Sequence, residues 1–305
     1  MIANRVAFSE TLAELVQENK DIYILDADAC KSTGTLVCRD KASSRFVQCG
    51  IAEQNMMGIA AGLAYTGKIP FACTFAVFTC MRAVEQVRNS ICYANASAKI
   101  VGTHAGLETG GDGGTHQAIE DISIMRALPN MSVIVPSTPN NTRKLTRAMA
   151  GHNGPCYMRL GKDPAPELYE DSEEFSIGGS RMLKDGKDIT VIACGSMVWR
   201  ALEAAKILER ENINARVIDM YSIKPLDEEA IIKAAEETKG IVTVEDHNVL
   251  GGLGGAVAEV LTSKKPAKLK RLGLQDVFGR SGLSKELYEM YHLTPEDIAR
   301  EIKNF

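Results

Sequence analysis

The sequence lacks any apolar run close to the ~20 residues that a membrane-spanning helix needs, and its first residues hold no apolar signal core. We therefore expect neither a membrane protein nor a secreted one. An excess of one charge is also missing, because 35 Lys and Arg side chains are set against 39 Asp and Glu, which leaves a net charge of −4. This balance argues against bulk binding of nucleic acid or of an anionic membrane, although it is compatible with a local basic pocket.

Paired cysteine motifs are missing as well. The eight cysteines are scattered through apolar segments, and none of them forms a Cys-x-x-Cys pair. Such a distribution is typical of reduced core residues and indicates a cytoplasmic chain that does not bind zinc.

Strand-like and helix-like segments alternate along the 305 residues, and this pattern is typical of an α/β protein. The expected strands are 21–25, 45–49, 71–75, 99–103, 132–135, 156–159, 189–193, 215–218, 241–245 and 267–272. The expected helices are 5–17, 53–65, 81–93, 119–127, 141–150, 198–211, 228–237 and 256–261, with two more near the C-terminus. We predict two doubly wound domains with mostly parallel sheets, residues 1–165 and 186–305, joined by a proline-containing, acidic linker, residues 166–185.

The densest glycine cluster lies in residues 110–117, Gly-Gly-Asp-Gly-Gly-Thr-His-Gln. Glycine allows a ligand to approach the backbone closely, but it weakens regular structure, so such a cluster needs a reason. It would bring Asp112 and His116 against a bound molecule, with His104 just upstream. A flexible surface turn is the simpler alternative.

Several polar and aromatic residues follow the carboxyl ends of the expected strands, where open α/β sheets bind their ligands. They are Glu53, Phe75, Phe78, His104 and Arg159. Each has an ordinary structural explanation: an acid near a helix dipole, core aromatics, or a salt-bridge partner. Their convergence on one edge of one sheet is much less expected by chance, and it predicts a binding site there.

The motifs that carry these residues resemble those of transketolases, in the same order. They are residues 50–56 (Gly-Ile-Ala-Glu-Gln-Asn-Met), 74–78 (Thr-Phe-Ala-Val-Phe), 103–104 (Thr-His), 111–117 (Gly-Asp-Gly-Gly-Thr-His-Gln) and 135–137 (Val-Pro-Ser). Over essentially its whole length the chain is similar to the C-terminal subunit of a split transketolase, with a pyrimidine-binding domain and a C-terminal domain. Deoxyxylulose-phosphate synthases and 2-oxo-acid decarboxylase components are related alternatives.

The resemblance implies thiamine diphosphate as the cofactor. The residue matching Glu53 hydrogen-bonds the pyrimidine nitrogen opposite the amino group and thereby stabilises the imino tautomer, which is a strong internal base. Phe75 and Phe78 match the aromatic side chains that wall the pyrimidine. Many transketolases have a third aromatic residue where this chain has Met81, which implies a differently shaped pocket.

The resemblance also assigns substrate contacts. His116 matches the imidazole that contacts the donor carbonyl oxygen, and Asp112 matches the carboxylate that reads the neighbouring hydroxyl. His104 and Arg159 match groups near the substrate phosphate. In a looser local match, Arg5 and Ser32 fall near two further phosphate-contacting positions.

A Gly-Asp-Gly segment followed by asparagine, which holds Mg²⁺ and the diphosphate in this family, has no counterpart here. The three letters recur at 111–113, but the following Thr-His-Gln places them in the pyrimidine-side loop. The resemblance therefore implies no metal ligand in this chain, a Mg²⁺ site on an N-terminal partner subunit, and two copies of each chain. Alone, the chain would hold half a cofactor site and be inactive. A non-catalytic assembly subunit is the alternative of a different class.

A second glycine cluster spans residues 251–255. It lies more than five residues beyond its strand, so a tight turn that packs a helix onto the sheet is favoured over a dinucleotide-binding loop. For the nearby His247, two placements stay open: the partner and the domain interface.

Overall fold

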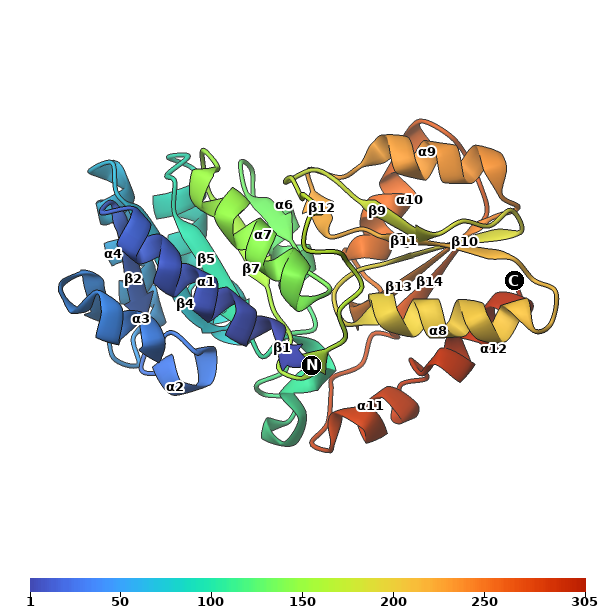
Figure 1. Ribbon diagram of the computed structural model, residues 1–305, viewed down its shortest axis with the longest axis horizontal. Helices are drawn as coiled ribbons and strands as arrows, with labels where there is room; N and C mark the ends of the chain where they lie inside the picture. Colours follow the sequence, from blue (N-terminus) through green and yellow to red (C-terminus); the bar gives the residue numbers. More distant parts are fainter.

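The computed structural model describes residues 1–305 as two α/β units, each built on its own mostly parallel sheet (Figure 1). In each of the two large sheets a single edge strand is antiparallel to its neighbour, and all other pairings are parallel. A separate two-stranded ribbon joins β1 (Ile2–Ala3) and β8 (Pro164–Ala165). These sheets confirm the predicted fold class. No helix has the length and apolar character required to cross a bilayer.

The first sheet has seven strands, and helices cover both of its faces. In spatial order its strands are β12 (Ser222–Lys224), β6 (Ser132–Ile134), β7 (Cys156–Arg159), β5 (Lys99–Thr103), β4 (Ile69–Phe75), β2 (Ile22–Asp26) and β3 (Phe46–Gln48). Its long helices are α1 (Asn4–Glu18), α4 (Glu53–Tyr65) and α7 (Pro139–Gly151), and α6 (Asp121–Ala127) is shorter.

Alternate strand residues point to opposite faces of this sheet. Ile24 packs in one apolar cluster with Phe8 and Leu12 of α1, whereas its neighbour Leu25 belongs to a second cluster with Met56 of α4. Because both faces are buried, the strands are continuous apolar runs in the sequence. For this reason they could be predicted from the sequence.

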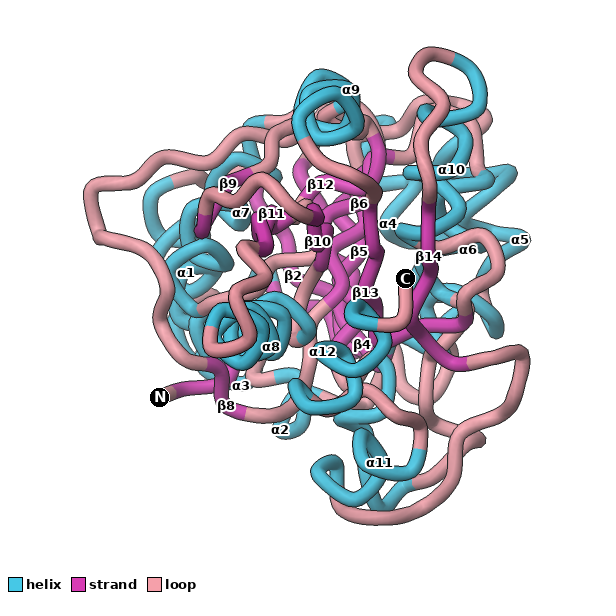
Figure 2. Tube along the Cα trace, turned by 90° about the vertical axis from the view of Figure 1, so that its right-hand side faces the viewer, coloured by secondary structure: helices cyan, strands magenta, loops and turns pink.

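The second sheet runs in the order β14 (Leu269–Leu274), β13 (Ile241–Asn248), β10 (Ile189–Ala193), β11 (Ala215–Asp219) and β9 (Arg181–Lys184). Helices α8 (Met197–Glu209) and α12 (Pro295–Lys303) pack together on one face, and α9 (Glu228–Glu237) and α10 (Leu253–Ser263) on the other. Figure 2 shows the strands of both sheets in the middle of the molecule, with α1, α7 and α8 to one side and α4, α6 and α10 to the other.

Several segments differ from the predictions. Strand β12 belongs by sequence to the second unit, yet it pairs with β6 and completes the first sheet. Strand β9 lies inside the predicted linker and pairs with β11. The expected helix 81–93 begins earlier, with wide turns of π type at η2 (Phe78–Arg82) and η3 (Val87–Cys92) on either side of the short helix α5 (Val84–Gln86). The boundaries of the two domains stay a prediction.

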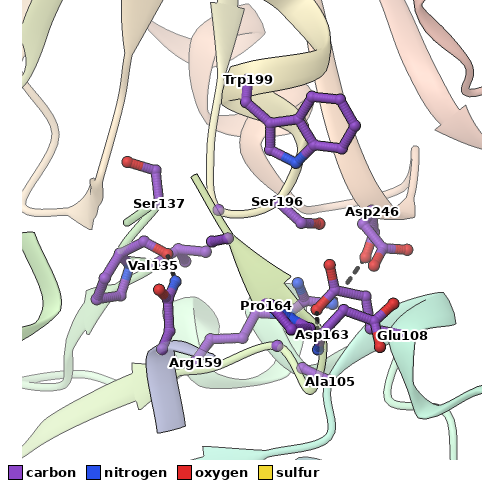
Figure 3. Close-up of a pocket in the computed structure, with 15 residues that line it drawn as sticks. Ala105, Glu108, Val135, Ser137, Arg159, Asp163, Pro164, Ser196, Trp199 and Asp246 are labelled. Atoms are coloured by element: carbon purple, nitrogen blue, oxygen red, sulfur yellow. Dashed lines mark hydrogen bonds between the residues drawn. The ribbon is translucent and has the colours of Figure 1, made fainter. Parts of the chain in front are cut away.

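The two units meet at a polar junction around Asp246, near the end of β13. Its carboxylate accepts hydrogen bonds from the backbone N–H of Leu107 at 3.0 Å and from the Tyr288 hydroxyl at 3.0 Å. Its backbone carbonyl accepts a bond from the Arg159 guanidinium at 2.7 Å. Figure 3 shows Trp199 and Ser196 of the second unit across a pocket from Arg159 and Glu108 of the first.

The second glycine cluster and His247 belong to the same junction. The Glu245 carboxylate accepts hydrogen bonds from the N–H groups of Leu253 and Gly254, and so caps the start of α10. His247 is fully buried, and its Nε2 accepts a bond from the Ser123 N–H of α6 at 3.3 Å. The cluster is therefore a tight turn before a helix, as favoured from the sequence, and His247 lies at the domain interface.

Glu108 should make stability fall as the pH rises. Burial raises the pKa of its carboxyl from 4.5 to about 7, so the folded state holds this proton more tightly than the unfolded state does. The stability that this proton contributes is fully present below the unfolded pKa of 4.5. It is lost as the pH rises through the folded pKa of about 7. Glu108→Gln, which is neutral at all pH values, should gain on the order of 3 kcal/mol relative to the natural chain between pH 4.5 and pH 8.

Urea unfolding at several pH values measures this difference. The matched control is Glu229→Gln, because Glu229 is exposed and forms no hydrogen bond or ion pair through its side chain. Parallel pH curves for the natural chain and Glu108→Gln would contradict the prediction.

Candidate functional site

The candidate site lies at the carboxyl edge of the first sheet. The parallel registers place Asp26 beside Gln48, Phe75 beside Thr103, and Gly102 beside Arg159. The residues that follow these strand ends therefore share one edge, as the sequence predicted.

An aromatic cluster forms the wall of the site. The rings of Phe75 and Phe78 are parallel to within 2°, with centroids 5.8 Å apart, and His104 stacks on Phe75 at 4.0 Å. His116 meets Phe78 edge-on at 5.6 Å. Four side chains from three separate segments thus form one flat-sided wall, which suits a planar ring. Met81 is partly buried and packs against the core.

Glu53 is the first residue of α4, and only 2% of it is exposed. A buried carboxylate needs a partner, and Arg82 supplies it: its Nη1 donates to Glu53 Oε1 at 2.9 Å. The same guanidinium lies over the Phe78 ring, with Cζ 4.1 Å from the centroid.

Arg82 was missed by the sequence analysis. The sequence feature that could have identified Arg82 is its four-residue spacing from Phe78, because this spacing places two side chains on one helical face. Because the helix was expected to begin at residue 81, Phe78 lay outside it and the pair was not seen.

His104 is held in an unusual state. Its backbone has a φ of 54°, in the left-handed region, and its Nδ1 lies 3.0 Å from the Thr103 hydroxyl. Burial, together with the nearby charges of Arg5 and Lys162, lowers the pKa of the imidazole to about 4. His104 is therefore neutral at neutral pH, and a neutral imidazole can donate or accept a hydrogen bond.

Two cations and a carboxylate surround this imidazole. Arg5 Nη1 donates to the backbone carbonyl of Ser32 at 2.9 Å, while its buried Nε atom has no hydrogen-bond partner. Lys162 Nζ reaches the Thr109 carbonyl at 3.3 Å. Asp112 is exposed at the end of η4 (Gly106–Asp112). The structure thus brings Arg5 and Ser32 together and adds Lys162, which the sequence analysis did not single out.

Arg159 is held in place by internal partners. It is buried, and its Nε donates to the Asp121 carboxylate at 2.9 Å. Its Nη2 donates to the backbone carbonyls of Ala118 and Asp246. Nε and Nη2 are thus committed to internal partners, whereas Nη1 is used by none of these bonds and Arg159 lines the pocket between the two units. A buried arginine takes the nearest carboxylate, and the sequence could not show that Asp121 lies there.

The glycine-rich loop packs closely against the second unit. A Cβ atom on Gly113 would lie 2.3 Å from the Ser281 hydroxyl, and one on Gly114 would lie 2.5 Å from the Gly279 carbonyl. Gln117 Nε2 donates to the Arg280 carbonyl at 3.0 Å. The glycines therefore allow the second unit to hold the loop that carries Asp112 and His116.

The structure contains no cluster of three or more His, Cys, Asp or Glu side chains that could hold a metal ion.

Comparison with known proteins gives two family matches. The pyrimidine-binding domain of transketolase matches residues 1–166, and the transketolase C-terminal domain matches residues 178–298. A transketolase C-terminal section of Methanocaldococcus jannaschii is 47% identical over 98% of this chain and 94% of its own length. A subunit of an apulose-4-phosphate transketolase from Phocaeicola vulgatus is 40% identical over 100% of this chain and 98% of its own length.

Two further proteins bear on the organisation of the chain. Human transketolase is 35% identical over 99% of this chain, but only 49% of the human protein is covered. A solved structure of a split-gene transketolase, described as an inactive β4 tetramer, is 48% identical with a TM-score of 0.93, and the match covers 100% of this chain and 98% of that one.

His104 should not titrate between pH 5 and pH 8, because its pKa lies near 4 and only the neutral ring is present above that value. An NMR titration of histidine ring protons measures this directly, with the His104 signals identified by their loss in His104→Gln. A titration midpoint near 6.5 for these signals would show that the imidazole is not desolvated as described.

Proposed function

The chain belongs to the transketolase family, and from this premise we propose that it is the C-terminal subunit of a two-chain transketolase. The resemblance found in the sequence motifs is confirmed at the level of the family. In the proposed reaction a two-carbon ketol unit moves from a ketose phosphate to an aldose phosphate. Thiamine diphosphate, when bound, supplies the electron sink that makes the donor C–C bond cleavable.

The observation that carries this proposal is the pairing of a buried carboxylate with an aromatic wall. Glu53 offers a nearly water-free oxygen beside the face of Phe78, and Arg82 already uses both with a flat, delocalised N–H donor. An aminopyrimidine ring has the same three properties: it is flat, it is delocalised, and it carries N–H groups when protonated. The residues present therefore fit the pyrimidine half of the cofactor.

In this role Glu53 holds a proton shared with the pyrimidine nitrogen, and burial keeps water from competing for it. Phe75 and Phe78 position the ring through their faces. Phe75 is the last residue of β4, Phe78 lies just beyond it in η2, and Glu53 is the first residue of α4, so the sheet and this helix set their spacing.

The substrate would lie beyond the wall, towards the exposed rim. We propose that His116 binds the donor carbonyl oxygen and that Asp112 accepts a hydrogen bond from the adjacent hydroxyl. His104, neutral and stacked on Phe75, can serve a second oxygen without adding charge. A site that pairs a given hydroxyl discriminates strongly against sugars that lack it, because its own groups would be left unpaired.

The phosphate of the substrate would bind at the basic end of the site. Arg5 has a buried Nε without a partner, and it lies beside Ser32 and near Lys162. Arginine presents a planar fork that matches phosphate oxygens. Arg159 would contribute through Nη1, which none of its internal hydrogen bonds uses. Its hydrogen bond to the Ala118 carbonyl holds the end of the glycine-rich loop.

A partner chain would complete the enzyme. The chain spans about half of the human transketolase that it matches, and its relatives include a protein named as one subunit of a transketolase and a split-gene enzyme. We propose that an N-terminal subunit supplies the ligands for Mg²⁺ and the diphosphate, that two copies of each chain assemble, and that this chain alone is inactive.

A donor screen tests the reaction type. The two purified chains, combined with thiamine diphosphate and Mg²⁺, should transfer a two-carbon unit between sugar phosphates, and neither chain should do so alone. Release of carbon dioxide from pyruvate would instead indicate a decarboxylating enzyme of related fold. Turnover by this chain alone would contradict the requirement for a partner.

Glu53→Gln should lower the turnover of the combined chains by at least about 100-fold, because an amide cannot share a proton with the ring as a carboxyl group does. Glu203→Gln, an exposed substitution on α8, is the matched control and should leave turnover unchanged. Equal rates for Glu53→Gln and the natural chain would favour a non-catalytic assembly subunit.

A further inference from the structure

We propose that Arg82 occupies the pyrimidine subsite before the cofactor enters, and that the cofactor must displace its guanidinium in order to bind. This inference rests on the function proposed above, and it concerns a residue that function does not use. Arg82 would be a gate to the subsite, and its side chain would set the apparent affinity for the cofactor.

The contacts of Arg82 are the two that a bound pyrimidine would need. Its Nη1 lies 2.9 Å from Glu53 Oε1, and its Cζ lies 4.1 Å from the centre of the Phe78 ring. Only one flat group can use the same carboxylate oxygen and the same ring face at one time. The guanidinium and the pyrimidine are therefore mutually exclusive at this position.

The two ends of this ion pair differ in their exposure, and that difference shows which group moves. The Glu53 side chain is 2% exposed and fixed at the start of α4, whereas the Arg82 side chain is 47% exposed on a long flexible stem. Arg82 can swing into solvent, and Glu53 cannot. The carboxylate thus stays in place for the incoming ring.

A released Arg82 guanidinium can turn into solvent, and an exposed carboxylate lies nearby in the sequence. Glu85 lies three residues further along the chain, in α5, and its exposed carboxylate contacts only Gln86 and Asn89. Because the Arg82 side chain is already half-exposed, turning its guanidinium towards solvent replaces a buried partner with water and exposed groups. This limits the cost of opening the subsite.

The closed state also has a purpose that follows from electrostatics. A buried carboxylate without a partner is strongly destabilising, and a chain that holds only half of a cofactor site spends time without its other half. Arg82 satisfies Glu53 during that time. The consequence is weaker apparent binding, because the cofactor meets an open subsite only in the fraction of molecules whose guanidinium has moved away.

Calorimetric titration of the assembled two-chain enzyme with thiamine diphosphate in the presence of Mg²⁺ tests the gate. Arg82→Ala should bind the cofactor about tenfold more tightly, equivalent to about 1.4 kcal/mol. Arg82→Met, which keeps the length of the side chain without its charge, should behave alike, so that a folding defect in one variant does not decide the result. Arg88→Ala is the matched control, because Arg88 is exposed on the same segment and contacts only Asn89.

A second ligand separates the gate from a general change in affinity. Inorganic diphosphate with Mg²⁺ carries no pyrimidine, so it should bind the natural enzyme and Arg82→Ala equally. Unchanged or weaker binding of thiamine diphosphate by both Arg82 variants would overturn the gate and leave the proposed function standing. Failure of the natural assembly to bind thiamine diphosphate at all would overturn the proposed function and the gate with it.

Discussion

A carboxylate taken out of water must be given a partner, and this constraint organises the candidate site. Glu53 is nearly inaccessible at the start of α4. The Arg82 guanidinium satisfies it and stacks on Phe78 at the same time. A pocket that accepts a flat cation between a carboxylate and a phenyl ring is also suited to an aminopyrimidine. The proposed cofactor chemistry and the proposed gate both follow from this one buried charge.

The second unit contributes to the site by holding its loops in place. Asp246 binds the backbone of Leu107 and, through its carbonyl, the Arg159 guanidinium, which in turn holds Asp121. On the other side of the loop, Gly113 and Gly114 lie against residues 279–281. Asp112 and His116 are therefore positioned between two contacts with the second unit. None of the proposed catalytic side chains comes from that unit, yet the geometry of the rim depends on it.

Most of the fold was predictable because the strands are buried on both faces. The expected strands 99–103, 156–159 and 189–193 agree with β5, β7 and β10, and the expected helices 53–65 and 228–237 agree with α4 and α9. The errors share a cause, which is that the deciding contacts are distant in sequence. Strand β12 has only three residues, and it is a strand because β6 offers it a free edge. The helix after Phe75 begins early, in a π-type turn, because its residues Phe78 and Arg82 are held against the site.

The sequence by itself determined the α/β class and the edge of the sheet where the candidate side chains gather, because strand ends and glycine-rich loops have local sequence patterns. It also carried the family motifs around Glu53 and His116. Only the tertiary structure decided how the charges pair. Arg82 with Glu53, Arg159 with Asp121, and Arg5 with the Ser32 carbonyl are separated by 27 to 38 residues. A charged side chain takes the partner that folding brings within reach, and in a buried site that choice depends on packing in three dimensions.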